Sequence, residues 1–140
     1  MLNSEDREKI QDLNARFCHS LDQARFEQWA RCFTPDGVFA SALGSFQGRQ
    51  VLIDFARGYH QTLAGAQQRH IVSNISVNME GARATAVSTL TLYVTREGAT
   101  QFLGVGIYED ELVKTDGEWL LAKRQVSLDT QPAGNVVLPR

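Results

Sequence analysis

The sequence predicts an α+β domain in which three helices precede an antiparallel sheet. Three stretches within residues 5–63 carry apolar side chains at helical spacing, whereas residues 69–128 alternate between apolar and polar side chains. Glycine-containing turns separate the alternating segments at hairpin-like intervals. Helices followed by a run of strands are typical of a fold whose helices gather on one face of the sheet.

Length and composition indicate one soluble domain spanning residues 1–140. The chain has 43% hydrophobic and 21% charged residues and a net charge of −2. It carries no basic tract, signal-peptide pattern or long apolar run, so we expect a cytoplasmic protein without nucleic-acid or membrane partners. Cys18 and Cys32 lie in helical pattern without companions at ligand spacing. We therefore expect buried, reduced thiols and no metal.

Three helices are expected before the sheet. The first begins near Ser4 and runs to Asp22, with its apolar side chains at helical spacing. The second covers residues 26–33 and ends at the TPDG sequence of residues 34–37, because proline and glycine disfavour its continuation. After a short strand at residues 38–40 and a glycine-bracketed loop, the third helix covers residues 51–63.

Four long strands follow and complete the predicted domain. They are expected at residues 69–79, 84–95, 101–114 and 119–128. Gly104 and Gly106 permit bending, so we expect the sheet to curl around the helices. The tail from Thr130 onward is expected to be irregular.

The stretch QRHIVSN at residues 68–74 holds the first candidate site residue, His70. Strict alternation places His70 in one row with Asn74, opposite the more apolar row of Ile71 and Val77. A β-bulge, or a polar cavity in a curved sheet, would bring the imidazole inside. Two interpretations stay open: a solvated strand histidine, or a base.

Asp22 and Arg124 are the other two candidates, each because its position is unfavourable without a partner. A carboxylate at the negative end of a helix is electrostatically disfavoured. Alternation sets Arg124 in an apolar row with Leu120 and Val126, where a cation needs an ion pair or a wet pocket. Asp22 is either a solvated turn residue or an acceptor for a cation or imidazole, and Arg124 is either a structural ion pair or part of a site.

Several stretches resemble the SnoaL-like branch of the nuclear transport factor 2-like superfamily. They are LDQARFEQW (21–29), FTPDGVF (33–39), GR (48–49), RHIVSN (69–74) and YEDELVKTDGEW (108–119). The resemblance covers about residues 5–129. It implies a cone in which a strongly curved antiparallel sheet wraps around three N-terminal helices and encloses a deep pocket.

Within that superfamily, the chain looks closest to the scytalone dehydratase, bile-acid dehydratase and hexachlorocyclohexane dehydrochlorinase group. Those enzymes pair an aspartate at the end of the first helix with a histidine at the start of a long strand, and Asp22 and His70 fall on these positions. Arg124 matches an arginine of the dehydrochlorinase. Phe17 replaces a polar residue of some relatives, and residues 92–96 lack the second histidine of scytalone dehydratase.

The resemblance implies a cofactor-independent lyase or isomerase of the dehydratase type, with His70 as base, Asp22 as its partner and Arg124 as charge stabiliser. The expected substrate is a small hydrophobic cyclic molecule. An alternative stays open: a non-catalytic small-molecule-binding or accessory protein, like a polyketide cyclase or the small subunit of a ring-hydroxylating dioxygenase. Relatives also imply a homodimer or higher homo-oligomer.

The expected pocket wall is mainly aromatic and measures a few hundred cubic ångströms in volume. Its substrate-binding residues are expected to be Phe17, Trp29, Phe39, Phe55, Tyr59, Asn74, Leu90, Phe102 and Tyr108.

Overall fold

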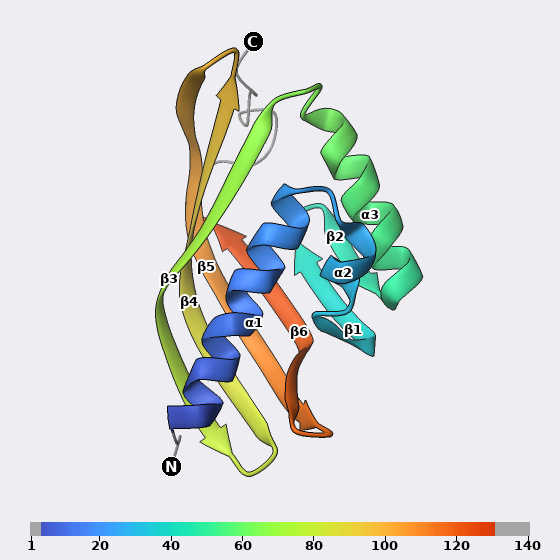
Figure 1. Cartoon of the computed structure of the whole chain (residues 1–140), viewed down its shortest axis with the longest axis vertical. Coiled ribbons are helices and arrows are strands. Elements are labelled where there is room, and N and C mark those ends of the chain that lie inside the picture. The colour runs from blue at the N-terminus through green and yellow to red at the C-terminus, as the bar shows by residue number, and fades with distance from the viewer. Residues whose placement is uncertain (1–3, 131–140) are drawn as a thin grey trace.

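The computed structural model describes residues 4–130, which form three helices and one six-stranded sheet (Figure 1). The helices are α1 (Ser4–Asp22), α2 (Phe26–Ala30) and α3 (Arg49–Thr62). The strands are β1 (Phe33–Ser41), β2 (Gly44–Gln47), β3 (Gln67–Glu80), β4 (Arg83–Arg96), β5 (Ala99–Thr115) and β6 (Glu118–Leu128). The predicted α+β class is confirmed. The expected irregular tail lies, from residue 131 on, outside the described residues.

The sheet has the order β2-β1-β6-β5-β4-β3. The predicted antiparallel meander is confirmed for β3 to β6, but β1 pairs parallel with β6. The expectation of a wholly antiparallel sheet is therefore wrong at β1. Parallel pairing is possible there because β2, α3 and three long strands connect β1 to β6, so no tight turn imposes an antiparallel return.

The second helix is shorter than the sequence predicts, since Phe33 begins β1 instead of ending α2. The carbonyl of Cys32 accepts a hydrogen bond from the backbone N–H of Leu121, and the carbonyl of Phe33 accepts one from Arg49 Nη2. Both donors come from distant parts of the chain. These tertiary hydrogen bonds outweigh the local helical pattern.

The long strands bend around α1, which crosses the concave face of the sheet (Figure 1). The strand register shifts in β3, between β4 and β5, and between β5 and β6. Such bulges bend the strand that carries them. At Gly106, a β-carbon would collide with the backbone of Ser127 and Leu128, so only glycine allows β5 and β6 to approach this closely.

Aromatic rings fill the space between α1, α2 and the sheet. Phe17 lies 5.6 Å from Trp29 and 5.8 Å from Tyr108, measured between ring centroids. Phe33 and Phe39 complete this buried cluster. None of the helices formed by residues 4–130 is long and apolar enough to cross a membrane.

The convex face of the sheet carries exposed apolar side chains, namely Ile71, Val87, Phe102 and Ile107 of β3, β4 and β5. Exposed apolar side chains on one face of a sheet are typical of an interface, and a stable interface buries about 800 Å² per partner. We therefore still expect a homodimer or higher homo-oligomer. Light scattering at micromolar concentration should give at least twice the chain mass, and Phe102→Lys should shift it toward the monomer. A monomeric wild type would contradict this prediction.

Candidate functional site

The candidate site begins where α1 ends at Asp22. Its carboxylate accepts two hydrogen bonds from one residue of β3: 2.6 Å from Oδ1 to Nδ1 of the His70 ring, and 2.8 Å from Oδ2 to the His70 backbone nitrogen. Only 3% of the Asp22 side chain and 7% of the His70 side chain are exposed. The two donors explain why a carboxylate sits at the negative end of a helix.

A bulge in β3 explains why His70 faces inward although strict alternation opposes it. The β3–β4 register shifts between Ser73 and Ser76, and Asn74 adopts a positive φ of 53°. Before the bulge, Val72 of the histidine's row packs against the core; after it, Val77 of the opposite row does so. Because of the one extra residue, the row of His70 faces inward before the bulge and the opposite row faces inward after it.

Gln67 holds the backbone of the candidate site in place. Its Nε2 donates to the main-chain carbonyl of Asp22 at 2.9 Å, which joins the end of α1 to the start of β3. The aspartate and the histidine are thus held by main-chain as well as side-chain contacts. Such double attachment keeps a side chain close to one orientation.

The hydrogen-bond pattern assigns the tautomer of a neutral His70. Because Nδ1 faces the carboxylate, the ring proton belongs on Nδ1 and the lone pair on Nε2. Nε2 makes no hydrogen bond with any of residues 4–130. The ring is therefore arranged to accept a proton at Nε2 while Asp22 stabilises the resulting charge.

Arg124 lies fully inside the domain and forms a two-pronged ion pair. Its Nε and Nη2 atoms each lie 2.8 Å from a carboxylate oxygen of Asp110, and Nη2 also donates to Oδ1 of Asn14 at 2.6 Å. The guanidinium carbon lies 4.4 Å from the ring centroid of Phe17 and 4.1 Å from that of Tyr108. Burial opposes the charge, but the hydrogen bonds from Arg124 to Asp110 raise the pKa of Arg124 above its usual value.

A second bulge places Arg124 inside, and the row expected from strict alternation is correct only beyond it. Val126 packs against the core as expected, whereas Leu120 lies before the bulge and falls in the other row. Leu112 of β5 pairs with Leu121, while Glu111 pairs with Lys123, so Ala122 is the extra residue. Trp119 and Leu121 point inward before the bulge and Arg124 after it, whereas Leu120 and Leu128 are not buried.

Asp110 and Asn14 hold Arg124, and the sequence reasoning did not single them out. A signal was available: Asp110 sits between Tyr108 and Leu112 in the buried row of β5, and Asn14 sits on the apolar face of α1. A carboxylate and an amide in such rows need partners as much as the arginine does.

Three polar groups on inner rows of the sheet have unused hydrogen-bonding capacity. The carboxamide of Gln68 is 1% exposed, and neither its nitrogen nor its oxygen has a partner among the described residues. The same holds for Oγ of Ser88 and for Nη1 of Arg124. Buried polar atoms without partners are rare, so they mark positions where water or a ligand completes the bonding.

The residues expected to line the pocket divide into two groups. Phe17, Trp29, Phe39, Leu90 and Tyr108 are buried, and Phe55 and Tyr59 are partly buried. Burial raises the pKa of the Tyr59 hydroxyl, and the negative charge of Asp22 raises it further.

Two of the expected wall residues lie elsewhere. Phe102 is 56% exposed and pairs with Tyr93 on the convex face, because β4 and β5 shift register beside it. Asn74 is exposed because it forms the β3 bulge. Neither residue can line an interior wall in this conformation.

The interior cavity itself stays a prediction. Two hollows mark the described surface: one beside the C-terminal half of α1 and α2, the other beside the N-terminal half of α1. Asp22, His70 and Arg124 line neither of them. A bound small molecule would test whether the inner face of the sheet opens to admit one.

Both cysteines are free and buried, as the sequence predicts. Burial raises the pKa of Cys18 to about 12 and raises that of Cys32 as well, so neither thiol is a nucleophile near neutral pH. Within residues 4–130, no three His, Cys, Asp or Glu side chains gather closely enough to hold a metal ion.

Comparison with known proteins assigns the family. The SnoaL-like domain matches residues 3–125. A substituted form of Rv3472, a protein of unknown function from Mycobacterium tuberculosis, is similar in structure, with a TM-score of 0.83 and 30% identity over 94% of this chain and 76% of that one.

Two further solved structures are similar. A Catenulispora acidiphila protein in complex with S-DNPA has a TM-score of 0.83 and 28% identity over 91% of this chain and 96% of that one. An NTF2-like protein with a cystatin-like fold from Novosphingobium aromaticivorans, at 24% identity over 92% and 85% of the two chains, has a TM-score of 0.84 and shows the same fold. The chain belongs to the SnoaL-like domain family, within the nuclear transport factor 2-like fold.

Proposed function

We propose that this protein is a cofactor-independent lyase or isomerase of the dehydratase type that acts on a small, hydrophobic, cyclic molecule. The observation that carries the proposal is the buried pair of Asp22 and His70, joined at 2.6 Å, with Nε2 of the histidine left without a partner among the described residues. An imidazole with one nitrogen fixed by a carboxylate and the other free is the usual arrangement of a general base.

In the proposed reaction, Nε2 of His70 removes a proton from a carbon atom of the substrate. The electron pair of that C–H bond either forms a carbon–carbon double bond as hydroxide or halide departs, or moves onto a neighbouring carbonyl as an enolate. The Asp22 carboxylate stabilises the imidazolium. Elimination gives a lyase, and return of the proton to another carbon gives an isomerase.

Two inner-wall donors are suited to stabilise the negative charge that develops. Arg124 uses Nε and Nη2 for Asp110 and Asn14, which leaves the N–H groups of Nη1 available. Gln68 precedes His70 by two residues on the same strand face, and its amide nitrogen is also free of partners among the described residues. Donors fixed before the reaction stabilise an oxyanion without reorganisation.

The Catenulispora neighbour was solved in complex with S-DNPA, which supports ligand binding by a chain of this fold. The alternative of a non-catalytic container is weaker. A solvent-exposed pair would have favoured it, whereas Asp22 and His70 are buried and 2.6 Å apart.

Proton exchange in deuterium oxide tests the proposal without knowledge of the natural substrate. We would incubate the protein with 1-tetralone and related small cyclic ketones and follow loss of the α-proton signal by NMR. Exchange faster than with buffer alone, abolished by His70→Ala, is the expected result. No exchange of any cyclic ketone that binds the protein would contradict the proposal.

Replacement of Gln68 by leucine should separate stability from activity. Because both amide atoms are buried without partners in the described chain, leucine removes an uncompensated desolvation cost, and we expect the free energy of unfolding to rise by roughly 1 kcal/mol. Exchange should fall, since the amide donor is lost. Urea unfolding measures the first effect and NMR the second. A destabilised variant with full activity would show that Gln68 is a structural residue.

A further inference from the structure

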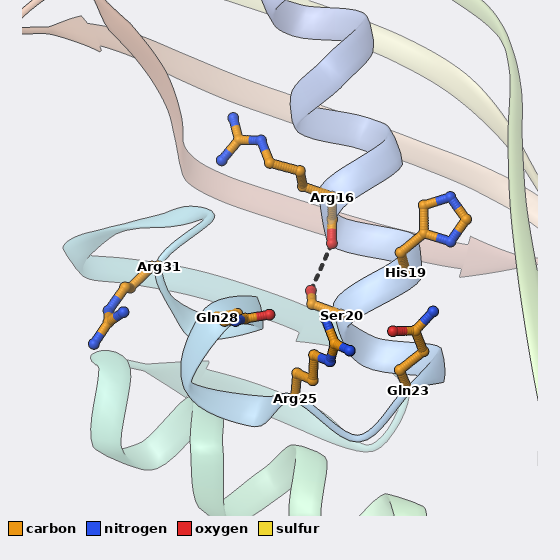
Figure 2. Close-up of a pocket in the computed structure, with 7 residues that line it drawn as sticks. All are labelled: Arg16, His19, Ser20, Gln23, Arg25, Gln28 and Arg31. Carbon is orange, nitrogen blue, oxygen red and sulfur yellow. Dashed lines mark hydrogen bonds between the residues drawn. The ribbon is translucent and has the colours of Figure 1, made fainter.

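A basic hollow of about 340 Å³ lies on the outer side of α1, where the chain turns into α2. It is lined by seven residues with polar or basic side chains, which come from α1, the α1–α2 link, α2 and the residue after it: Arg16, His19, Ser20, Gln23, Arg25, Gln28 and Arg31 (Figure 2). Within residues 4–130, no carboxylate lines it. The chain as a whole has a net charge of −2, so three arginines without an acidic residue reverse the local sign of charge.

Two of the three arginines have no counter-ion in the described chain. Neither Arg25 nor Arg31 lies within 4.0 Å of a carboxylate among residues 4–130, whereas Arg16 contacts Asp12 at 2.8 Å. Figure 2 shows Arg25 extending from the α1–α2 link back toward the end of α1. Guanidinium groups that line one hollow without a counter-ion leave a net positive charge there, which a bound anion would compensate.

Several carbonyls at the end of α1 are already hydrogen-bonded within the chain. Backbone N–H groups of Gln23, Ala24 and Arg25 donate to the carbonyls of His19, Leu21 and Ser20, respectively. The carbonyl of Arg16 accepts from the Ser20 hydroxyl at 2.6 Å. The partial negative charge of this helix end is therefore taken up by hydrogen bonds within the chain.

Stabilisation of a helix end explains the position of only some of the basic residues that line the hollow. Cations in the last turn of a helix are favourable, and His19 fits that role in α1. Arg25 lies in the link beyond α1, and Arg31 follows α2, a helix of five residues with a weak dipole. Their presence on the same hollow needs a different reason.

We propose that this hollow binds a small molecule carrying a doubly charged oxyanion group, either a phosphate ester or a dicarboxylate. The planar guanidinium group of arginine matches the oxygens of a phosphate and of a carboxylate, and the side-chain amides of Gln23 and Gln28 add uncharged hydrogen-bond donors. The hollow is distinct from the inner pair, because neither Asp22 nor His70 is among its lining residues. It does not depend on the function proposed above.

Titration of the ¹⁵N-labelled full chain with inorganic phosphate, pyrophosphate and succinate, at constant ionic strength, tests the site. We expect saturable shifts confined to residues 16–31. Arg25→Gln combined with Arg31→Gln should weaken binding by roughly tenfold. Arg57→Gln is the matched control, since Arg57 is an exposed arginine on α3 with a loose contact of 3.9 Å to Asp54. Preference for phosphate or for succinate identifies the oxyanion class.

A second measurement guards against loss of structure in the double variant. The anion should raise the unfolding temperature of the wild type and of Arg57→Gln but not that of the double variant. Shifts spread over the surface, equal effects at Arg57, or unchanged binding in the double variant would each overturn the assignment.

Discussion

His70→Ala is expected to lower the rate of α-proton exchange roughly 100-fold or more, the usual contribution of a positioned general base. The ring is buried, and its Nε2 has no other task in the described chain. His19→Ala is the matched control, since His19 is an exposed histidine of the same helix that ends at Asp22.

Asp22→Asn should lower the exchange rate by a comparable factor, and the hydrogen bonds of Asp22 give the reason. The two carboxylate oxygens each accept one donor, the His70 ring and the His70 backbone N–H. Asparagine has one acceptor oxygen and one donor nitrogen, so it cannot satisfy both. If its oxygen stays on the backbone N–H, its amide donates to Nδ1, and the ring proton moves to Nε2. In that tautomer Nε2 carries a proton, so it cannot accept one from the substrate.

The two residues are expected to act as one unit, so the double variant should be little slower than either single variant. Circular dichroism and urea unfolding should confirm that each variant is folded. Full exchange activity in both single variants would disprove the mechanism and leave the fold unaffected.

Asp110→Ala is expected to cause the largest loss of stability, about 3–5 kcal/mol in the free energy of unfolding. It leaves the Arg124 guanidinium buried with only Asn14 as a polar partner among the described residues. Asp54→Ala is the control: the Asp54–Arg57 pair lies 3.9 Å apart and more than half exposed, so its loss should stay within about 0.5 kcal/mol. Urea unfolding curves measure both.

A double replacement separates the structural role of Arg124 from the proposed chemical one. Asp110→Leu with Arg124→Met removes both charges at similar volume, so much of the lost stability should return. Activity should not return, because the free N–H groups of Arg124 are gone. If the Asp110→Ala variant lost less than about 1 kcal/mol, the ion pair would have to be solvated in the native protein, contrary to its burial.

The parts of the fold that local sequence determines were predictable. The apolar spacing and the stop at Asp22 define α1, and glycine turns mark the β3–β6 meander. The resemblance supplied the site, since only it joined Asp22 to His70 across 48 positions of the chain. Composition and spacing alone could not, because a single strand histidine is far more often structural than catalytic.

What strict periodicity could not predict is the direction of side chains after a bulge. One extra residue near Asn74 and another at Ala122 reverse the rows of β3 and β6. The sequence of neither strand by itself indicates the insertion, because each bulge is defined by pairing with another strand, β4 for β3 and β5 for β6.

By itself, the sequence determined the fold class, the long helix that ends at Asp22, and the buried, reduced state of the two cysteines, because these depend on local spacing and on hydrophobicity. Only the tertiary structure decided that β1 pairs parallel with β6, that Asp110 and Asn14 hold Arg124, and that Phe102 faces outward. The reason is physical. Strand register and the pairing of buried charges are set by contacts between residues far apart in the chain, and their free energies appear only once those residues meet.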